Sequence, residues 1–537
     1  MASRIAAWIL ADQLIEDHPA LRRAERLAGG DRGAVRVVLV ESRAAARRLP
    51  FHRIRQTLIL AAGRHHAAEL AGRGYEVEVV AVGSSRDGLI EHARRHRPDR
   101  LVTMLAAEHA PRRWQQGSMA ADLGLAVEVV PNTQFLVGRF DPIPDPEPGR
   151  RYVMEDFYHA MRRRFRLLLG PGDEPAAGRW NFDLDNRRRL PRRAAIPRPI
   201  RFEPDAITRG AIDEVEASGW GVGSALGFDL AATRADAEAA AEDFFRHRLP
   251  DFGPFEDALS RDDGVLFHST LSAQLNLGLL DPLHLARRAE AEYHAGRAPI
   301  KSVEGFVRQV VGWREFIYWQ YHRQMPGLRR ANAWGATRPM PRMFWDGRTD
   351  LACIRAVVGR LHESAYAHHI ERLMVVCNFA LLAGIDPAVV ADWFLAFYAD
   401  SHDWVVLPNV IGMGLNADGG LTATKPYLAS GAYIDRMGDF CGTCPRDPAA
   451  RTGPAACPFT TLYWDFLIRH EAELARNPRL GLALVGLTRI KPAGRAAIAA
   501  DAAAFRDGLE PWDPAADPTR APAPPRPAAR QAPLRLG

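Results

Sequence analysis

The sequence concentrates its thiol chemistry in one stretch. All five cysteines lie between residues 353 and 457, and two of them form Cys441-Gly-Thr-Cys444, which is followed after twelve residues by Cys457-Pro458. A CxxC pair places two thiolates on one turn, so two further cysteines brought in by the fold would complete a four-thiolate site. Such a site holds a structural zinc ion or an iron–sulfur cluster.

Helical spacing separates Cys377 from this set. It has a leucine four residues before it and another four residues after it, which places all three on one helix face and predicts a core role for Cys377. Cys353 then remains as the distant fourth ligand. The Cys-Pro pair that closes the set is common in bacterial cluster motifs and favours iron–sulfur over zinc. The alternative is a group of reduced, buried and unlinked thiols.

Composition indicates a globular protein of two to four domains. The chain has 537 residues, of which 47% are hydrophobic and 25% charged. It has no apolar run of membrane-spanning length and no secretory signal at its start, so we expect a cytoplasmic protein with free thiols and no membrane association. The formal net charge of +6 is compatible with a phosphate-backbone partner, and equally with a solvated arginine-rich surface.

The first 135 residues alternate apolar runs with helical spacers, which predicts a doubly wound parallel α/β sheet. The expected strands are Arg4–Leu10, Val35–Val40, Tyr75–Val82, Leu101–Leu105 and Ala126–Val130. Polar residues follow three of them: Asp12 and Gln13, Glu41, and Glu108. The crevice at the carboxyl ends of such strands is the usual ligand site, so these side chains either bind a heterocycle or are ordinary loop residues. There is no dinucleotide fingerprint and no Walker A loop.

The remaining chain divides by its patterns. Residues 136–230 are expected to form a connector with a proline-rich turn, a helix at Glu155–Leu169 and the basic run Asn186–Arg193. This basic run either binds phosphates or is a solvated loop. Residues 231–510 repeat apolar positions at three and four residues, which predicts a large all-α domain. Residues 511–537 are rich in Pro, Ala and Arg and are expected to be a disordered tail.

Several long motifs carry a family resemblance. They include Met154-Glu-Asp-Phe-Tyr-His-Ala-Met-Arg, His268-Ser-Thr-Leu-Ser, Glu304-Gly-Phe-Val-Arg, Tyr366-Ala-His-His-Ile-Glu-Arg, Ala417-Asp-Gly-Gly and Lys425-Pro-Tyr. Over roughly residues 1–480 the chain resembles the photolyase/cryptochrome superfamily, and within it the bacterial iron–sulfur branch known as prokaryotic (6-4) photolyases. The resemblance implies an FAD in the helical domain, a 4Fe-4S cluster on Cys353, Cys441, Cys444 and Cys457, and a 6,7-dimethyl-8-ribityllumazine antenna in the N-terminal domain.

The resemblance also assigns cofactor residues. His268, Ser269, Leu271 and Ser272 match the segment at the flavin diphosphate, and Glu304, Arg308, Trp313 and Arg314 match the next cofactor-facing helix. Asp400 falls where the superfamily places a carboxylate beside the flavin. Asp12, Gln13 and Glu41 are the candidate antenna contacts.

The expected lesion pocket contains two histidines and two tyrosines. His368 and His369 match the paired histidines of the branch, and because neighbouring helical residues point about 100° apart, one of them can face the pocket and pass a proton. Otherwise they cap or pack at a helix start. Tyr427 and Tyr433 match aromatic residues that stack on an extruded base, unless they are half-buried core residues.

Trp345 and Trp393 would relay electrons between the surface and the flavin, or fill the core. Two positions depart from the family pattern. Val406 stands where the superfamily places the residue facing flavin N5, and valine offers neither a hydrogen bond nor a proton, so we expect a flavin less able to hold a neutral radical. Phe394 stands where tyrosine is common and is a poorer electron relay.

Together these features predict a monomeric enzyme that binds UV-damaged DNA and repairs (6-4) photoproducts with light, through an electron from reduced FAD and a proton from a histidine. The first alternative is a blue-light receptor of cryptochrome type without repair activity, which the residues at 394 and 406 favour. The second is a flavin-free, zinc-stabilised DNA-binding module.

Overall fold

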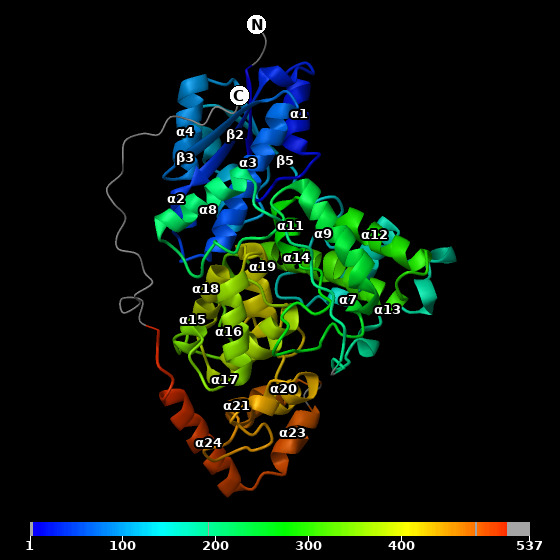
Figure 1. Cartoon of the computed structure of the whole chain (residues 1–537), viewed down its shortest axis with the longest axis vertical. Coiled ribbons are helices and arrows are strands. Elements are labelled where there is room, and N and C mark those ends of the chain that lie inside the picture. The colour runs from blue at the N-terminus through cyan, green and yellow to red at the C-terminus, as the bar shows by residue number, and fades with distance from the viewer. Residues whose placement is uncertain (1–3, 192, 478, 480, 513–537) are drawn as a thin grey trace.

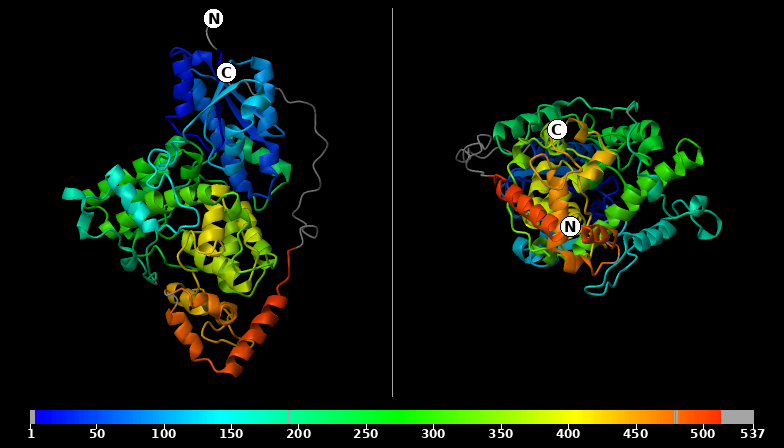
Figure 2. Two further views of the ribbon diagram at one scale, coloured as in Figure 1. Left: turned by 180° about the vertical axis from the view of Figure 1, so that it is seen from behind. Right: turned by 90° about the horizontal axis from the view of Figure 1, so that it is seen from below.

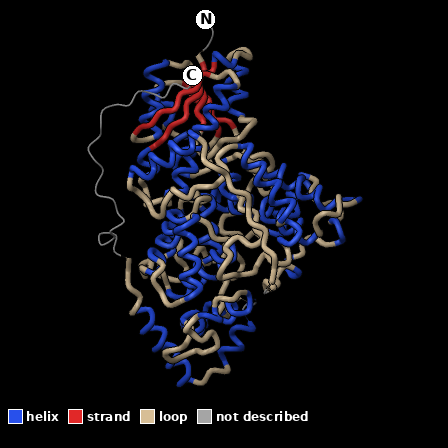
Figure 3. The backbone as a smooth tube through the Cα atoms, viewed as in Figure 1, coloured by secondary structure: helices blue, strands red, loops and turns tan. Residues whose placement is uncertain are grey.

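The computed structural model describes residues 4–512, except residues 192, 478 and 480. Its N-terminal part is a five-stranded parallel sheet with the order β3-β2-β1-β4-β5. The strands are β1 (Ile5–Ile9), β2 (Val35–Ser42), β3 (Glu76–Val82), β4 (Arg100–Met104) and β5 (Ala126–Val130). In the centre Ile5 pairs with Val35 on one side and with Arg100 on the other. Figure 3 shows the strands gathered at one end of the molecule. The predicted parallel sheet is confirmed.

Helices cover both faces of the sheet because alternate side chains of a strand point to opposite faces. Helices α1 (Pro19–Leu27) and α3 (Arg53–Gly72) pack with Ile5, Ala7 and Ile9 of β1. Ala6 and Trp8 of the same strand face α4 (Ser85–His96), α5 (His109–Gln116) and α6 (Met119–Leu123).

The first of these faces continues into the helical part of the chain. Its apolar residues belong to one core with residues of α7 (Met154–Phe165), α9 (Arg234–His247), α12 (Pro282–His294), α13 (Ile300–Val307) and α14 (Arg314–Gln324). Figure 2 shows the helices following the sheet along the long axis of the molecule. This shared core contains residues on both sides of positions 135 and 230. The predicted domain boundaries at 135, 230 and 510 therefore stay predictions.

A second core fills the C-terminal half. Its main helices are α16 (Ala352–Ser364), α17 (Asn378–Ala383), α18 (Pro387–Phe397), α19 (Asp403–Leu407), α20 (Gly431–Met437) and α21 (Pro458–Arg469). Helices α23 (Gly481–Thr488) and α24 (Pro492–Asp507) close the end away from the sheet (Figure 1). Other helices of the chain are α8 (Ala206–Ser218), α10 (Leu249–Phe252), α11 (Ser272–Leu277), α15 (Met343–Asp346) and α22 (Glu471–Leu474).

The described residues contain three π-helical segments, and two of them interrupt the runs Val303–Tyr321 and Met374–Ala383, whose apolar spacing predicts regular helices. They are η5 (Arg308–Trp313), η7 (Glu371–Cys377) and η8 (Pro408–Gly414). A π segment carries an extra residue per turn, so it changes which side chains share a face. Cys377 is a buried core residue, as predicted, although Leu373 on the same segment is only half-buried. A β-carbon at Gly414 would lie 2.6 Å from Cys377 Sγ, so glycine permits the close approach of η7 and η8.

Within the described residues, no helix is both long enough and apolar enough to cross a bilayer. The predicted tail lies outside the described residues from 513 onward.

Candidate functional site

A buried ion pair between two helical segments forms the centre of the candidate site. Arg372 of η7 donates to both carboxylate oxygens of Asp400, each at 3.0 Å. The Ser272 hydroxyl donates to the same carboxylate at 2.6 Å, and the Asn276 side chain donates to the Asp400 carbonyl at 2.9 Å. Burial acts to raise the pKa of Asp400, but the Arg372 charge and these hydrogen bonds outweigh it and hold the pKa below the ordinary value. Asp400 is therefore a fixed buried carboxylate.

A second buried arginine lies near this ion pair. Arg248 is 1% exposed, and its Nε has no hydrogen-bond partner. Both Arg248 and Arg372 interact electrostatically with His268 and with Tyr366, so the two guanidinium groups border the segment that starts at His268. A buried guanidinium with a free donor is costly unless an acceptor is bound to it. An anionic group such as a diphosphate would supply that acceptor.

Three histidines meet on the other side of this segment. The rings of His268 and His368 stack with centroids 4.6 Å apart, and His369 lies 5.3 Å from His268. His368 is fully buried and neither ring nitrogen has a hydrogen-bond partner, whereas His369 is exposed. The structure thus brings His368 and His369 to one place and points their rings into different environments.

The two histidines hold protons differently. Burial, followed by the charges of His268 and His369, lowers the pKa of His368 well below its ordinary value. Burial acts in the same direction on His369, but the Asp257 contact and the charge of Glu256 outweigh it and raise the pKa of His369. The His369 Nε2 lies 3.6 Å from Asp257 Oδ1. His369 is therefore the member of the pair suited to carry a proton near neutrality.

Tyr433 shares the charged neighbour Asp257 with His369, and Tyr427 shares Arg187 with Tyr433. Burial, followed by the charge of Asp257, raises the pKa of Tyr433, while Arg436 and Arg187 act against it. Arg187 also acts on Tyr427 and on Lys425. Arg187 is exposed and pairs with Asp183 and, at 4.0 Å, with Asp257. It lies within the basic run Asn186–Arg193, and only the fold shows that it reaches the two tyrosines.

The four residues expected on the cofactor-facing helix have separate surroundings. Glu304 accepts from the Phe182 backbone N–H at 3.1 Å, and burial raises its pKa to about 7. Arg308 pairs with Asp183 and Glu155 at 3.5 and 3.9 Å, on the side of Tyr427.

Arg314 is buried at a different place. It pairs with Glu315 and lies over the rings of Phe135 and Trp404, at the junction between the end of the N-terminal part and α19. Trp313 is half-buried beside Phe316. The π segment η5 separates Arg308 from Arg314, so helical spacing does not relate their directions. Their described contacts link Arg308 to the tyrosines and Arg314 to the domain junction.

Aromatic rings connect the predicted relay residues. Trp393 stacks on Phe397 at 4.7 Å, and Phe397 lies 5.6 Å from Trp345. Trp345 also stacks on Trp512 at 5.2 Å, which no local sequence signal indicates. Phe394 stacks on Tyr398, whose ring lies 4.2 Å from the Arg372 guanidinium. The rings thus form two neighbouring paths near Trp393, and one of them ends at Arg372.

Val406 is 7% exposed and belongs to the C-terminal core, so it presents only methyl groups. Its backbone N–H donates to the His402 carbonyl at 2.9 Å, which fixes it in the first turn of α19.

Four of the five cysteines line one small cavity. Cys353 of α16, Cys441 and Cys444 of the turn after α20, and Cys457 before α21 surround it together with Gly431, Arg446 and Phe459. Burial, followed by repulsion from the other three sulfurs, raises the pKa of Cys353 far above its ordinary value. Burial also raises the pKa of Cys441 to about 12 and that of Cys457 to about 11. The fold therefore gathers the predicted four cysteines and leaves Cys377 apart.

Of the polar residues after the strands, Glu108 contacts the helical part of the chain, whereas Gln13 and Glu41 bond within the N-terminal part. Gln13 is buried, donates to the Leu105 carbonyl at 3.0 Å, and has an unpartnered side-chain oxygen. Burial raises the pKa of Asp12 to about 6 and that of Glu108 to about 7. Glu108 accepts from the Asp403 backbone N–H at 2.9 Å. Glu41 is already paired with Arg64, at 2.8 and 3.0 Å.

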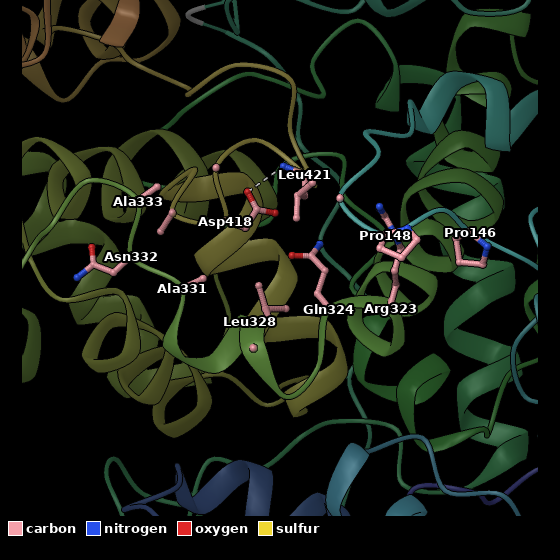
Figure 4. Close-up of a pocket in the computed structure, with 14 residues that line it drawn as sticks. Pro146, Pro148, Arg323, Gln324, Leu328, Ala331, Asn332, Ala333, Asp418 and Leu421 are labelled. Atoms are coloured by element: carbon pink, nitrogen blue, oxygen red, sulfur yellow. Dashed lines mark hydrogen bonds between the residues drawn. The ribbon is translucent and has the colours of Figure 1, made fainter. Parts of the chain in front are cut away.

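A surface cleft of about 770 Å³ lies elsewhere, between the proline-rich turn and the loop around Asp418. Figure 4 shows Pro148, Arg323, Gln324 and Leu421 around it. Asp418 accepts from the backbone N–H groups of Gly420, Leu421 and Thr422, so the Ala417-Asp-Gly-Gly motif builds a turn. None of the predicted flavin or lesion residues is among those that line this cleft.

Comparisons with known proteins identify the family of this chain. A curated (6-4) photolyase from Agrobacterium fabrum (strain C58) is 41% identical over 511 residues, which cover 94% of this chain and 99% of that protein. The chain belongs to the (6-4) photolyase family. A family model described as deoxyribodipyrimidine photo-lyase-related protein matches residues 7–229 of this chain.

Solved structures of the superfamily share the photolyase fold. A bacterial class III photolyase from Agrobacterium tumefaciens gives a TM-score of 0.54 at 16% identity and covers 81% of this chain and 86% of its own. The cryptochrome of Synechocystis sp. PCC6803 gives 0.55 at 15% identity with the same coverage. The predicted fold class, an α/β sheet followed by a large helical part, is confirmed.

Proposed function

We propose that this protein is a DNA photolyase that repairs (6-4) pyrimidine photoproducts with light. The full-length match to a (6-4) photolyase supports the reaction class. The observation that carries the proposal is the pair formed by His369 and Asp257, beside Tyr433 and Arg187 and close to the Arg372–Asp400 ion pair. A proton donor, base-stacking rings and phosphate-binding cations are the parts that such a repair needs.

The residues around Asp400 suit an FAD. The unpartnered Nε of Arg248 and the hydroxyl of Ser269 fit an anionic diphosphate, and Asp400, fixed by Ser272 and Arg372, would hold the ring system in place. When bound, the flavin supplies the light-driven electron and takes it back, so the net reaction is redox-neutral. Val406 would offer that ring system methyl groups only, with neither a hydrogen bond nor a proton.

The protein's own chemistry begins with the DNA. Arg187, Lys425 and Arg308 would hold phosphates at the rim, and an extruded lesion would stack on Tyr427 and Tyr433. His369 would donate a ring proton to the lesion, and Asp257, which faces Nε2, would stabilise the imidazolium before the transfer. His368, neutral and buried, would set the wall of the pocket.

The four-cysteine cavity suits a 4Fe-4S cluster better than a zinc ion. Four thiolates around one cavity would satisfy either group, and the Cys457-Pro458 pair, which is common in bacterial cluster motifs, supports the cluster. It would join α16 to the turn after α20 and to the start of α21.

The crevice around Gln13 and Asp12 is the proposed place for a ribityl-lumazine antenna, because Gln13 offers a buried unpartnered oxygen. Glu41 would contact it only by leaving Arg64. The monomeric state and the cytoplasmic location remain predictions.

The experiment is a repair assay on an oligonucleotide that carries one (6-4) photoproduct, with the reduced protein in light and in darkness. We expect the intact bases to return only in light. A matched oligonucleotide with a cyclobutane dimer tests the lesion class. If neither lesion is repaired while the protein is yellow and binds DNA, the blue-light receptor, which Val406 and Phe394 favour, replaces this proposal.

A further inference from the structure

A compact group of metal-ligating side chains lies in the N-terminal part, between the edge strand β3 and helix α4. Glu78 of β3 and His92 and His96 of α4 offer three ligand atoms that all lie within 4.8 Å of one another. Figure 1 shows α4 beside β3 at the outer end of the sheet, away from the helical part that holds the candidate site. The histidines are four residues apart, so they face the strand from successive turns of the helix.

The three side chains converge on one oxygen atom. Glu78 Oε2 lies 2.7 Å from His92 Nδ1 and 3.1 Å from His96 Nε2. The side chain of His92 is 1% exposed, that of Glu78 is 10% exposed and that of His96 is 21% exposed. The other ring nitrogen of His92, Nε2, is buried without a hydrogen-bond partner. One side of the group is therefore closed by protein, and His96 leaves the other open to water.

We propose that Glu78, His92 and His96 bind a divalent transition-metal ion of the zinc type. Two imidazole nitrogens and one carboxylate oxygen are ligands that zinc prefers, and a water molecule takes the fourth tetrahedral position. At a tetrahedral centre, bonds of about 2.0–2.2 Å place ligand atoms about 3.3–3.6 Å apart. Glu78 Oε2 must therefore move about 0.6–0.9 Å further from His92 Nδ1 when the ion binds.

The surrounding charges suit a dication. Arg95 pairs with the other Glu78 oxygen and with Glu91, so Oε2 stays free for a metal. Arg36 pairs with Glu76. Glu91 and Glu76 balance these two arginines, and Arg94, the other arginine of the last turn, is exposed to water, so Glu78 supplies the negative charge next to the metal position. The group also lies at the last turn of a twelve-residue helix, where the helix dipole favours a cation.

Such an ion would tie an edge strand to the helix that covers it. The site lies outside the proposed repair machinery, so its presence or absence does not depend on the photolyase reaction.

The test counts zinc equivalents on the full chain with ZnCl2 in competition with a chromophoric chelator. The wild type and His247→Gln are expected to bind one more equivalent than His96→Gln, whose affinity at this site falls by more than about 100-fold because a direct ligand is lost. His247 is the matched control because it is exposed and its Nδ1 lies 3.0 Å from Asp243, four residues earlier on the same helix. No group of three metal-ligating side chains among the described residues includes it. Equal counts in all three proteins would overturn the proposal.

A second measurement does not depend on any variant. Crystals of the wild type soaked in ZnCl2 should give an anomalous peak at the zinc edge between Glu78 Oε2 and the two histidine rings. An absent peak there, with zinc density elsewhere in the same crystal, would refute the site.

Discussion

The proton donor assigned to His369 depends on Asp257, and the substitution Asp257→Asn tests that dependence. The Asp257 contact raises the pKa of His369, so the proton is kept to higher pH and repair is lost only on the alkaline side. Without the carboxylate charge, the alkaline limb of the pH profile should move to lower pH, while the acidic side keeps its rate. The pH dependence of single-turnover repair in light measures this shift.

The size of the shift follows from the geometry. His369 is 43% exposed, so water screens the pair and the dielectric constant of water applies. At the observed 3.6 Å, Coulomb's law then gives about 1.2 kcal/mol between unit charges, which changes the protonation equilibrium about eightfold. The midpoint of the alkaline limb should therefore fall by slightly less than about one pH unit.

Asp183→Asn is the matched control. Asp183 and Asp257 both pair with Arg187, but only Asp257 contacts His369. The control should keep the wild-type alkaline limb, even if its affinity for DNA changes. An alkaline limb that is unmoved in Asp257→Asn would refute His369 as the proton donor.

Three further outcomes are expected. Cys353→Ser should lower the iron content per chain and the melting temperature, whereas Cys377→Ser should keep the wild-type iron content. Equal iron contents in the two variants would contradict the four-cysteine assignment. Tyr427→Ala should weaken binding to lesion DNA about 5- to 150-fold by loss of stacking, with Tyr427→Phe near the wild type; equal affinities in a binding titration argue against stacking. Phe394→Tyr should speed light-driven reduction of the oxidised flavin, measured by absorbance, because a phenol is oxidised more easily than a phenyl ring; an unchanged rate means that electrons bypass this position.

The sequence predicts regular elements well where one periodicity holds. Each of the five predicted strands agrees with the structure within two residues at either end, because each is a short apolar run between helical spacers. Helices that contain π segments are predicted less well. The run Val303–Tyr321 reads as one helix, but η5 interrupts it and separates the surroundings of Arg308 from those of Arg314.

The candidate site shows the same division. The convergence of four cysteines could be predicted from the CxxC motif and from the core spacing of Cys377, since both are local signals. The contacts of Arg187 with Asp257, and the stacking of Trp512 on Trp345, join segments far apart in the chain. Their residue types are ordinary, so no pattern in one sequence marks them.

The most direct measurement is a crystal structure of the flavin-loaded protein with an oligonucleotide that carries a (6-4) photoproduct. It should show the lesion outside the duplex, stacked on Tyr427 and Tyr433 and within hydrogen-bond distance of the His369 ring. A lesion that stays stacked in the duplex, or that binds on a face away from His369, would contradict the account.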